Sequence, residues 1–459
     1  MVPAIQEGIQ LTLPTLAGLT AQVGAIRSGY AVGRVSQIDS GLIEIVGLGQ
    51  DARLGDRLDL LRADGSNVEG EVLRLSRGGV AMLPDRAPEG VALDDRVRLV
   101  GDARLSPDAS WIGRIVDPMG RPMDGRPLVD GPVARDIRGR VPEAARRRAL
   151  GPRLDTGYAL FNTILPIVRG QRIGLFAGSG VGKSRLLGGF ARNMQADVVV
   201  VALIGERGRE LRDFVEEVLG AEGMARAVVI AATSDASPLL RRRCAWAAMT
   251  VAEHFRDIGA QVLLLADSVT RFAEAHREVA IASGELPAMR GYPASTAQTI
   301  MSLCERAGPG VGSAGDITAI FTVLVAGSDI DEPVADILRG TLDGHVVLDR
   351  AIAERGRFPA IDTLRSVSRS LPGAATDRQN STISEVRHLL GIYERSETMI
   401  RAGLYQAGSD PVTDRAIRAW EDLDRFVGEP ERLGIENSFN RLDLILRRSA
   451  QSGPVASPR

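Results

Sequence analysis

Apolar and polar positions divide this chain of 459 residues into zones with different periodicity. From about residue 30 to residue 100, short runs such as GLIEIVGL and EGEVLRL alternate apolar and polar residues and are separated by Gly, Asp and Pro. A period of two is typical of strands that bury one face, and short strands with turn residues between them favour a small barrel. We therefore predict a β-barrel over residues 30–100.

Continuous apolar runs alternate with helical segments between about residues 151 and 372. Strands covered on both faces read as such runs, and they belong to mostly parallel sheets with helices on either side. The runs that we expect to be strands are RIGLFA, ADVVVVALIG, RAVVIAA, QVLLLAD, DITAIFTVLVAG and GHVVLD. Residues 101–150 are rich in Pro and Gly and read as a connector, so an α/β domain with its connector is predicted over residues 101–372.

The two ends of the chain follow other patterns. Residues 373–449 show helical periodicity and predict a helical domain, whereas residues 450–459 are small and polar and predict a disordered tail. Residues 1–29 are nearly uncharged, are interrupted by polar residues and Pro, and lack a basic start, which argues against a signal peptide. The overall prediction is a multidomain α/β protein.

Composition narrows the function classes. The apolar content of 44% suffices for sizeable cores, and the net charge of −2 gives no general bias toward nucleic acid. We interpret the basic runs at 146–148 and 241–243 as solvated faces. Cys244 and Cys304 lie far apart and the four histidines lack ligand spacing, so neither a disulfide framework nor a zinc site is indicated and a cytoplasmic setting is favoured. No run of about 20 apolar residues exists to span a bilayer.

The segment AGSGVGKS, at residues 177–184, follows the predicted strand RIGLFA and precedes a helical stretch. Strand, Gly-rich loop and helix in this order predict a phosphate-binding loop, because the glycines let backbone N–H groups form an anion nest at a helix N-terminus. The predicted nucleotide-contacting residues are Ala177, Gly178, Ser179, Gly180, Val181, Gly182, Lys183 and Ser184. Ala177 stands where the motif usually has glycine, just before the tightest part of the loop.

Lys183 is the only lysine among 56 basic residues. Its compact ammonium can reach the β- and γ-phosphates inside a closed loop, where the larger planar guanidinium of arginine fits poorly. Ser184 is placed to ligate Mg²⁺ through its hydroxyl group.

Two carboxylates end the apolar runs that follow the phosphate loop. Glu206 could orient and deprotonate an attacking water, although such a residue alone also fits a solvated loop. Asp267 is positioned for the magnesium shell, or alternatively caps a turn. Arg271 either helps to hold the phosphates or ties neighbouring loops together.

Several motifs together resemble one family. The segments FAGSGVGKS, GERGRE, LLLADSVTRFAEAHREVA, LDGHVVLDR and PAIDTLRSVS are similar to those of hexameric ATPases related to the catalytic subunits of rotary ATP synthases. AGSGVGKS combined with SVTRFAEAHRE and RGYPAS favours the type III protein export branch, and LDRAIAERGRFPAID favours its flagellar members. The resemblance covers about residues 25–445.

The resemblance implies a fold and a set of roles. The fold would be an N-terminal β-barrel, a central RecA-like P-loop domain and a C-terminal helical domain, with ATP and Mg²⁺ as cofactors. The residues that match the family's positions are Lys183 as the phosphate-loop lysine, Ser184 as the Mg²⁺ ligand, Glu206 as the general base, Arg207 as a phosphate contact, Glu210 as a carboxylate of the magnesium water shell, Asp267 as the strand-end aspartate, Arg369 as the arginine presented to a neighbouring subunit's nucleotide, and Phe358 as the aromatic residue against adenine.

The resemblance also implies partners. It predicts a homo-hexamer, a regulatory subunit at the N-terminal segment (residues 1–29, chiefly 1–25), export chaperones and cargo that meet the C-terminal helices, and contacts with export-apparatus components. The protein would be cytoplasmic and would lie at the inner membrane only through partners. No nucleic acid is implied.

Four alternatives share the core. An injectisome secretion ATPase or a catalytic subunit of a rotary ATP synthase would perform the same chemistry; Glu206 and Arg369 in one chain suit a homo-oligomer, although synthase catalytic subunits also carry an arginine at the second position. A non-catalytic regulatory subunit would lack the glutamate. A translocase of single-stranded RNA needs aromatic platforms in its barrel, and residues 31–100 contain no Phe, Tyr or Trp.

Overall fold

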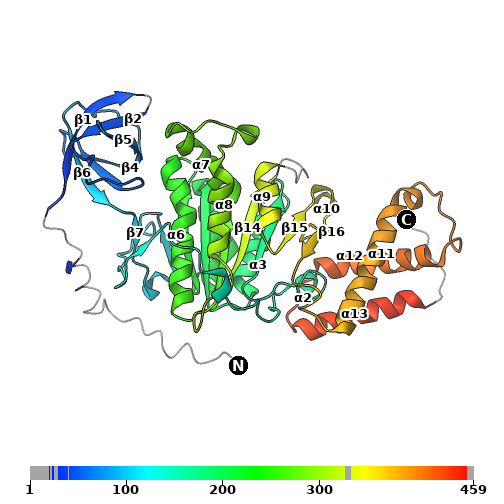
Figure 1. The fold of residues 1–459 in the computed structure, drawn as a ribbon. Coiled ribbons are helices and arrows are strands. Elements are labelled where there is room, and N and C mark those ends of the chain that lie inside the picture. The colour runs from blue at the N-terminus through cyan, green and yellow to red at the C-terminus, as the bar shows by residue number, and fades with distance from the viewer. Residues whose placement is uncertain (1–19, 21–22, 25–28, 40, 326–331, 452–459) are drawn as a thin grey trace.

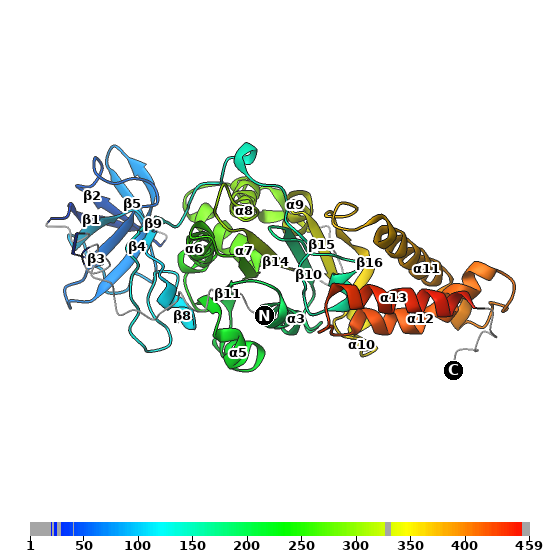
Figure 2. The ribbon, with the colours of Figure 1, turned by 90° about the horizontal axis from the view of Figure 1, so that it is seen from below.

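The computed structural model describes residues 20, 23–24, 29–39, 41–325 and 332–451. Three groups of elements follow one another along the molecule: a barrel, a central sheet covered by helices, and an arm of helices (Figures 1 and 2). Most of the predicted N-terminal segment and residues 452–459 of the predicted tail lie outside the described residues. The predicted fold class is confirmed.

Six strands close into the barrel, in the order β1-β2-β5-β4-β3-β6. Their bounds are β1 Val32–Asp39, β2 Leu42–Val46, β3 Arg57–Leu61, β4 Asn67–Ser76, β5 Gly79–Pro84 and β6 Arg96–Gly101. Alternate apolar side chains such as Ile43, Ile45, Leu58 and Leu60 point inward and are 0–1% exposed. The period-two pattern therefore produces a barrel with a filled apolar core.

Eight strands of the described chain form the central sheet, in the order β16-β15-β10-β14-β13-β11-β12-β8. The bounds are β8 Arg114–Val116, β10 Arg172–Ala177, β11 Val198–Glu206, β12 Ala227–Thr233, β13 Val262–Asp267, β14 Ile317–Leu324, β15 Gly344–Leu348 and β16 Ile361–Ser368. All pairs are parallel except β15 with β16. Each predicted apolar run contains one of these strands.

Two strands were missing from the prediction. The connector contributes β8, which pairs with β12, and PAIDTLRSVS contains β16, which pairs with β15. β8 has only three residues, and β16 is an edge strand whose exposed and buried positions are mixed. Neither strand therefore reads as a continuous apolar run. The connector also forms a two-stranded sheet from β7 (Arg104–Leu105) and β9 (Arg135–Asp136).

Helices cover both faces of the central sheet, and β11 contributes alternate side chains to the two cores. Val199, Val201 and Leu203 pack with α3 residues such as Phe190, whereas Val198 and Val200 pack with the helices of the opposite face. The helical elements of this domain are η1 Ala109–Trp111, η2 Ala144–Arg146, α2 Ala159–Asn162, α3 Lys183–Asn193, α4 Gly208–Asp213, η3 Phe214–Leu219, α5 Gly220–Met224, α6 Pro238–Asp257, α7 Val269–Ala282, η4 Met289–Gly291, α8 Ser295–Arg306, α9 Pro333–Thr341 and α10 Arg350–Glu354.

The C-terminal arm consists of α11 (Asp377–Arg401), α12 (Pro411–Gly428) and α13 (Ile435–Ala450). Its apolar side chains, among them Phe426 and Leu442, belong to the same core cluster as Phe161 of α2 and Phe190 of α3. The arm is thus packed directly on the face of the central sheet that α3 covers. α13 extends through Ala450, the first residue of the predicted tail.

The interpretation of residues 241–243 as a solvated face is wrong. The Arg241 side chain is only 15% exposed and pairs with Glu278 at 3.1 Å. Arg242 and Arg243 are 6% and 5% exposed, and both form ion pairs with the buried Glu71 of β4, at 3.0 and 3.4 Å. Because α6 lies against the barrel, these arginines, which the sequence suggests are on the surface, form a contact between the two domains. Both cysteines are free and buried. Within the described residues, no helix is long and apolar enough to cross a bilayer.

Candidate functional site

The phosphate loop joins the end of β10 to the start of α3. Gly180 and Gly182 take φ values of 77° and 88°, a left-handed conformation that side chains rarely adopt, so the tight turn depends on glycine there. Ala177 is the fully buried last residue of β10 and precedes that turn, which explains why alanine is accepted in place of glycine. The loop ends at the N-terminus of an 11-residue helix, where backbone N–H groups favour an anion.

Lys183 lies between two strand-end carboxylates. Its Nζ is 2.5 Å from Oδ1 of Asp267 and 3.8 Å from Oε1 of Glu206, and its side chain is 13% exposed. The hydroxyl of Thr322 on β14 donates to the same oxygen of Asp267 at 2.8 Å. Four parallel strands, β10, β11, β13 and β14, therefore bring these groups to one edge of the sheet, where open α/β sheets bind ligands.

Thr322 was missed by the sequence analysis. Its only signal is a single polar residue within the apolar run AIFTVL. It is fully buried, and its hydrogen bond orients the Asp267 carboxylate.

The environment of Glu206 favours its protonated form. Burial raises the pKa of Glu206 to about 7, helped by a hydrogen bond to Glu210 and by the negative charge of Asp267, while Lys183 opposes the shift. The pKa of Glu210 is lowered, mainly because it accepts that hydrogen bond and next because of Arg207. The proton shared by the two glutamates therefore resides on Glu206, close to neutrality.

Arg207 and Arg271 each pair with a glutamate close to them in the sequence. Arg207 is largely exposed and pairs with Glu210 at 3.0 Å. Arg271 pairs with Glu274 on its own helix at 3.1 Å. A methyl group at Gly205 would lie 3.6 Å from Cβ of Arg271, so the arginine stem packs beside the backbone that leads to Glu206.

Phe358 covers the end of the phosphate loop. A methyl group at Gly182 would lie 3.2 Å from Cδ1 of the ring, and 47% of Phe358 is exposed. The ring thus presents a free face beside the loop. A hollow of about 390 Å³ lies there, lined by Ser179, Gly180, Arg350, Ala353, Glu354 and Phe358.

Arg369 stands at the opposite edge of the sheet. Its backbone N–H donates to the carbonyl of Asp343, whose own N–H donates to the carbonyl of Arg172, the first residue of β10. Its guanidinium donates to the carbonyl of Arg339 at 3.0 Å. The six residues of β10, at ~3.3 Å each, separate this edge from the phosphate loop by ~20 Å. The structure therefore brings together every predicted site residue near the loop except Arg369.

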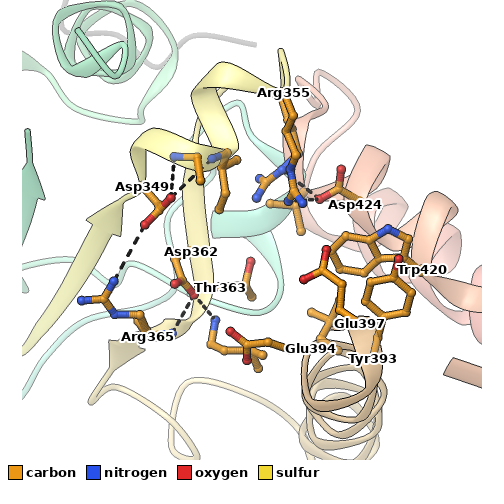
Figure 3. A pocket seen from close by; sticks show the side chains of 16 residues that line it. Asp349, Arg355, Asp362, Thr363, Arg365, Tyr393, Glu394, Glu397, Trp420 and Asp424 are labelled. Carbon is orange, nitrogen blue, oxygen red and sulfur yellow. Dashed lines mark hydrogen bonds and ion pairs between the residues drawn. The ribbon is translucent and has the colours of Figure 1, made fainter. Parts of the chain in front are cut away.

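A second cavity, of about 360 Å³, lies between β16, α10 and the C-terminal helices (Figure 3). Tyr393 and Trp420 stack on one side of it, with ring centroids 4.0 Å apart. Asp424 of α12 receives the guanidinium groups of Arg355 and Arg357. This cluster was not predicted from the sequence.

Comparison with known proteins places the chain in a family. Residues 157–368 match the model of the ATP synthase alpha/beta family, nucleotide-binding domain, and residues 375–443 match that of the T3SS EscN ATPase C-terminal domain. The chain is 43% identical over 441 residues to the flagellum-specific ATP synthase of Caulobacter vibrioides, with 94% of this chain and 99% of that protein covered. It is 38% identical over 414 residues to the type 3 secretion system ATPase of Xanthomonas euvesicatoria, with 90% and 93% covered.

A solved structure agrees with these relatives. The assembled ATPase EscN of the enteropathogenic E. coli type III secretion system superimposes with a TM-score of 0.83 at 35% identity, covering 90% of this chain and all of that one. The same ATPase has been solved in complex with its central stalk EscO, with a TM-score of 0.82. The resemblance inferred from the motifs is confirmed. This chain is therefore a P-loop ATPase that belongs to the family of flagellum-specific ATP synthases and type III secretion ATPases.

Proposed function

We propose that this ATPase works as a homo-hexameric ring that energises type III export of flagellar proteins, and that each of its sites is completed by Arg369 of the neighbouring copy. The position of Arg369 carries the proposal. It lies at the sheet edge opposite the phosphate loop and cannot reach the site of its own chain, yet it lies next to an exposed surface where a second copy can be met. The assembled state of the relative EscN supports a ring.

Lys183 and the loop N–H groups hold the phosphates in this proposal. In the structure described here, the Lys183 ammonium pairs with Asp267. Triphosphate oxygens offer that ammonium a stronger set of partners, so the lysine would turn toward them when nucleotide enters. Arg207 is exposed at the rim, in a position to add a phosphate contact. Arg271 packs beside the backbone that leads to Glu206 and pairs with Glu274, which supports a role in tying neighbouring loops together.

The donor set fits a magnesium ion. Ser184 offers a hydroxyl in the first turn of α3, Asp267 a buried carboxylate, and Glu210 a carboxylate farther out. All are oxygen ligands, and Mg²⁺ is usually held by one or two of these together with substrate phosphates and water. Among the described residues, no cluster of three or more His, Cys, Asp or Glu is arranged to hold a metal by itself. Bound Mg²⁺ would neutralise charge on the phosphates.

Glu206 serves as the general base. A base works best when its pKa is close to the working pH, because it is then both available and strong enough to accept a proton. The pKa of about 7 meets this condition. Glu206 would orient the attacking water and take its proton, and the neighbouring Glu210 would stabilise the protonated form that results.

Phe358 would provide the face against which adenine stacks. The half-exposed ring lies beside the phosphate loop, so a nucleotide whose phosphates occupy the loop could place its base on the exposed face of the ring. Stacking on one aromatic face gives affinity for a base with modest selectivity.

The partners follow from the relatives. EscN has been solved with its central stalk, and we propose a stalk or regulatory subunit for this chain as well, with the N-terminal segment as the regulator's site. Export chaperones, cargo and apparatus components would meet the C-terminal helices. In this proposal the protein is cytoplasmic and lies at the inner membrane only through these partners.

The test is a complementation experiment on the full chain. Specific ATPase activity of the wild type should rise with protein concentration as rings form, by up to about 10³- to 10⁵-fold, the range typical of an arginine supplied by a neighbouring subunit. Glu206→Gln and Arg369→Ala should each be inactive, and mixing them should restore activity at interfaces that combine an intact glutamate with an intact arginine.

Lys183→Ala mixed with Glu206→Gln is the matched control, because every site of that mixed ring lacks either its lysine or its glutamate. Flat specific activity together with no rescue would contradict the ring and would favour the rotary-synthase alternative, in which a different subunit supplies the arginine.

A further inference from the structure

The segment that carries Phe358 is fastened to the C-terminal arm. Residues 355–359, here called the aromatic segment, lie between α10 and β16 and run past the end of α12. Both arginines of the segment point toward one carboxylate of α12, as Figure 3 shows for Arg355. Arg355 and Arg357 reach Oδ1 of Asp424 at 3.2 and 3.0 Å.

Arg357 connects this carboxylate to the backbone that follows Phe358. Its guanidinium donates to the carbonyls of Pro359, at 3.2 Å, and Ile361, at 2.8 Å, while its Nε forms an ion pair with Asp424 at 3.0 Å. The Arg357 side chain is only 10% exposed. A charge this well buried is stable only when it is paired with an opposite charge. Asp424 therefore determines the position of the Arg357 guanidinium, and through its hydrogen bonds the position of the backbone of the aromatic segment.

The last turn of α12 also touches the segment directly. A methyl group at Gly428 would lie 3.1 Å from the carbonyl oxygen of Phe358 and 3.5 Å from Cγ of Arg357. Arg355 lies over Trp420, 5.4 Å from the ring centroid, which holds the start of the segment against the same helix. Asp424, Trp420 and Gly428 thus form one surface of α12 on which the aromatic segment is seated.

We infer that Asp424 is a positioning residue for nucleotide binding: through Arg357 and the contact at Gly428, α12 sets the position of the Phe358 ring over the phosphate loop. The inference rests on the proposed adenine contact of Phe358. As a consequence, the C-terminal arm and the adenine base both contact the aromatic segment, the arm through Asp424 and Gly428 and the base through Phe358. A partner that shifts α12 would change the affinity for ATP and ADP without touching the phosphate loop, and bound nucleotide would in turn favour the seated position of α12.

The experiment compares a ligand that has a base with one that lacks it. For the full chain, KM for ATP and the inhibition constants of ADP and inorganic tripolyphosphate are measured for the wild type, Asp424→Asn and Gly428→Ala. Asp422→Asn is the matched control, because Asp422 lies on the same helix and pairs with the exposed Arg425, at 3.1 Å.

We expect Asp424→Asn and Gly428→Ala to raise KM and the ADP constant by about tenfold, within the 5- to 150-fold range typical of coupled sites, with kcat and the tripolyphosphate constant unchanged. A change that merely loosened the fold would weaken both ligands. Asp422→Asn should behave as the wild type. Equal loss of ADP and tripolyphosphate, or an ADP constant in Asp424→Asn equal to that of Asp422→Asn, would overturn the inference.

Phe358→Ala separates this inference from the proposed function. If Phe358→Ala weakens ADP but not tripolyphosphate while Asp424→Asn has no effect, the adenine contact stands and the positioning by α12 fails. If Phe358→Ala leaves the ADP constant unchanged, the adenine contact itself is wrong, and the inference falls with it.

Discussion

The burial of Glu206, the proposed general base, leads to a prediction about stability as well as activity. Replacing Glu206 by glutamine removes a carboxyl that burial holds at a raised pKa, and keeps a side chain of the same size that can still donate a hydrogen bond to Glu210. We expect the variant to be inactive and, above neutral pH, more stable than the wild type. Active-site groups held in unfavourable environments commonly show this exchange of stability for function.

The pH window follows from the two pKa values. The ordinary pKa of a glutamate is 4.5 and that of Glu206 in the folded chain is about 7. Below pH 4.5 the carboxyl is protonated in both the folded and the unfolded state, so the full stability of the protonated form is present. Between pH 4.5 and about 7 only the folded chain holds the proton, so stability falls as the pH rises, and above 7 the contribution is lost. Glutamine does not titrate, so the variant does not lose this part of the free energy of unfolding as the pH rises.

The magnitude can be worked from the same shift. A pKa raised from 4.5 to about 7 corresponds to roughly 3 kcal/mol at 1.36 kcal/mol per pKa unit. The Glu206 side chain is 20% exposed, so solvent screening reduces the figure to about 1–2 kcal/mol. For a domain of about 150–250 residues that difference moves the melting temperature by roughly 2–8 °C.

The assay is calorimetric melting of the nucleotide-free protein at pH 8.5 and pH 5. Glu206→Gln should melt higher than the wild type at pH 8.5 and close to it at pH 5. Glu217→Gln makes the same chemical change at an exposed position of the same domain and should show no such dependence on pH. A shift of equal size at both pH values, or a lower melting temperature at pH 8.5, would refute the reasoning.

Two further predictions concern activity. Lys183→Arg should fold normally, because arginine can still pair with Asp267. Its kcat should fall by about 100-fold or more, since the bulky guanidinium misplaces the charge that stabilises the transition state. Steady-state kinetics, with melting curves as the folding control, would check this, and a near-normal kcat would contradict it. When kcat/KM is measured against pH, its acid limb should have an apparent pKa near 7. Glu210→Ala should lower this apparent pKa, because the hydrogen bond that favours protonated Glu206 is removed. An unchanged acid limb would indicate that another group titrates.

The sequence alone determined the parts of the protein that depend on local pattern. Period-two alternation specifies strands that bury one face, and continuous apolar runs specify strands buried on both, so the barrel and the parallel core could be predicted without any knowledge of packing. The phosphate loop was equally readable, because the φ values at Gly180 and Gly182 and the helix that follows are local requirements. Lys183, Glu206 and Asp267 were found because carboxyl ends of parallel strands converge on one edge.

Tertiary structure decided what depends on distant residues meeting. Strand β8 is three residues long and exists because β12 offers it a free edge. Thr322, on the same edge as Asp267, differs from its apolar neighbours only by one hydroxyl. Arg242 and Arg243 are charged in the sequence yet buried, because the barrel brings Glu71 to them.

The most informative distance is the one that separates Arg369 from its own phosphate loop. No periodicity could show that β16 runs antiparallel and carries its final residue to the far edge of the sheet, nor that Asp424, dozens of residues later, reaches the segment that holds Phe358. The hydrophobic pattern predicts which face of an element is buried. It does not predict which other element packs on that face, and this packing determines the positions of Arg369 and of the Phe358 ring.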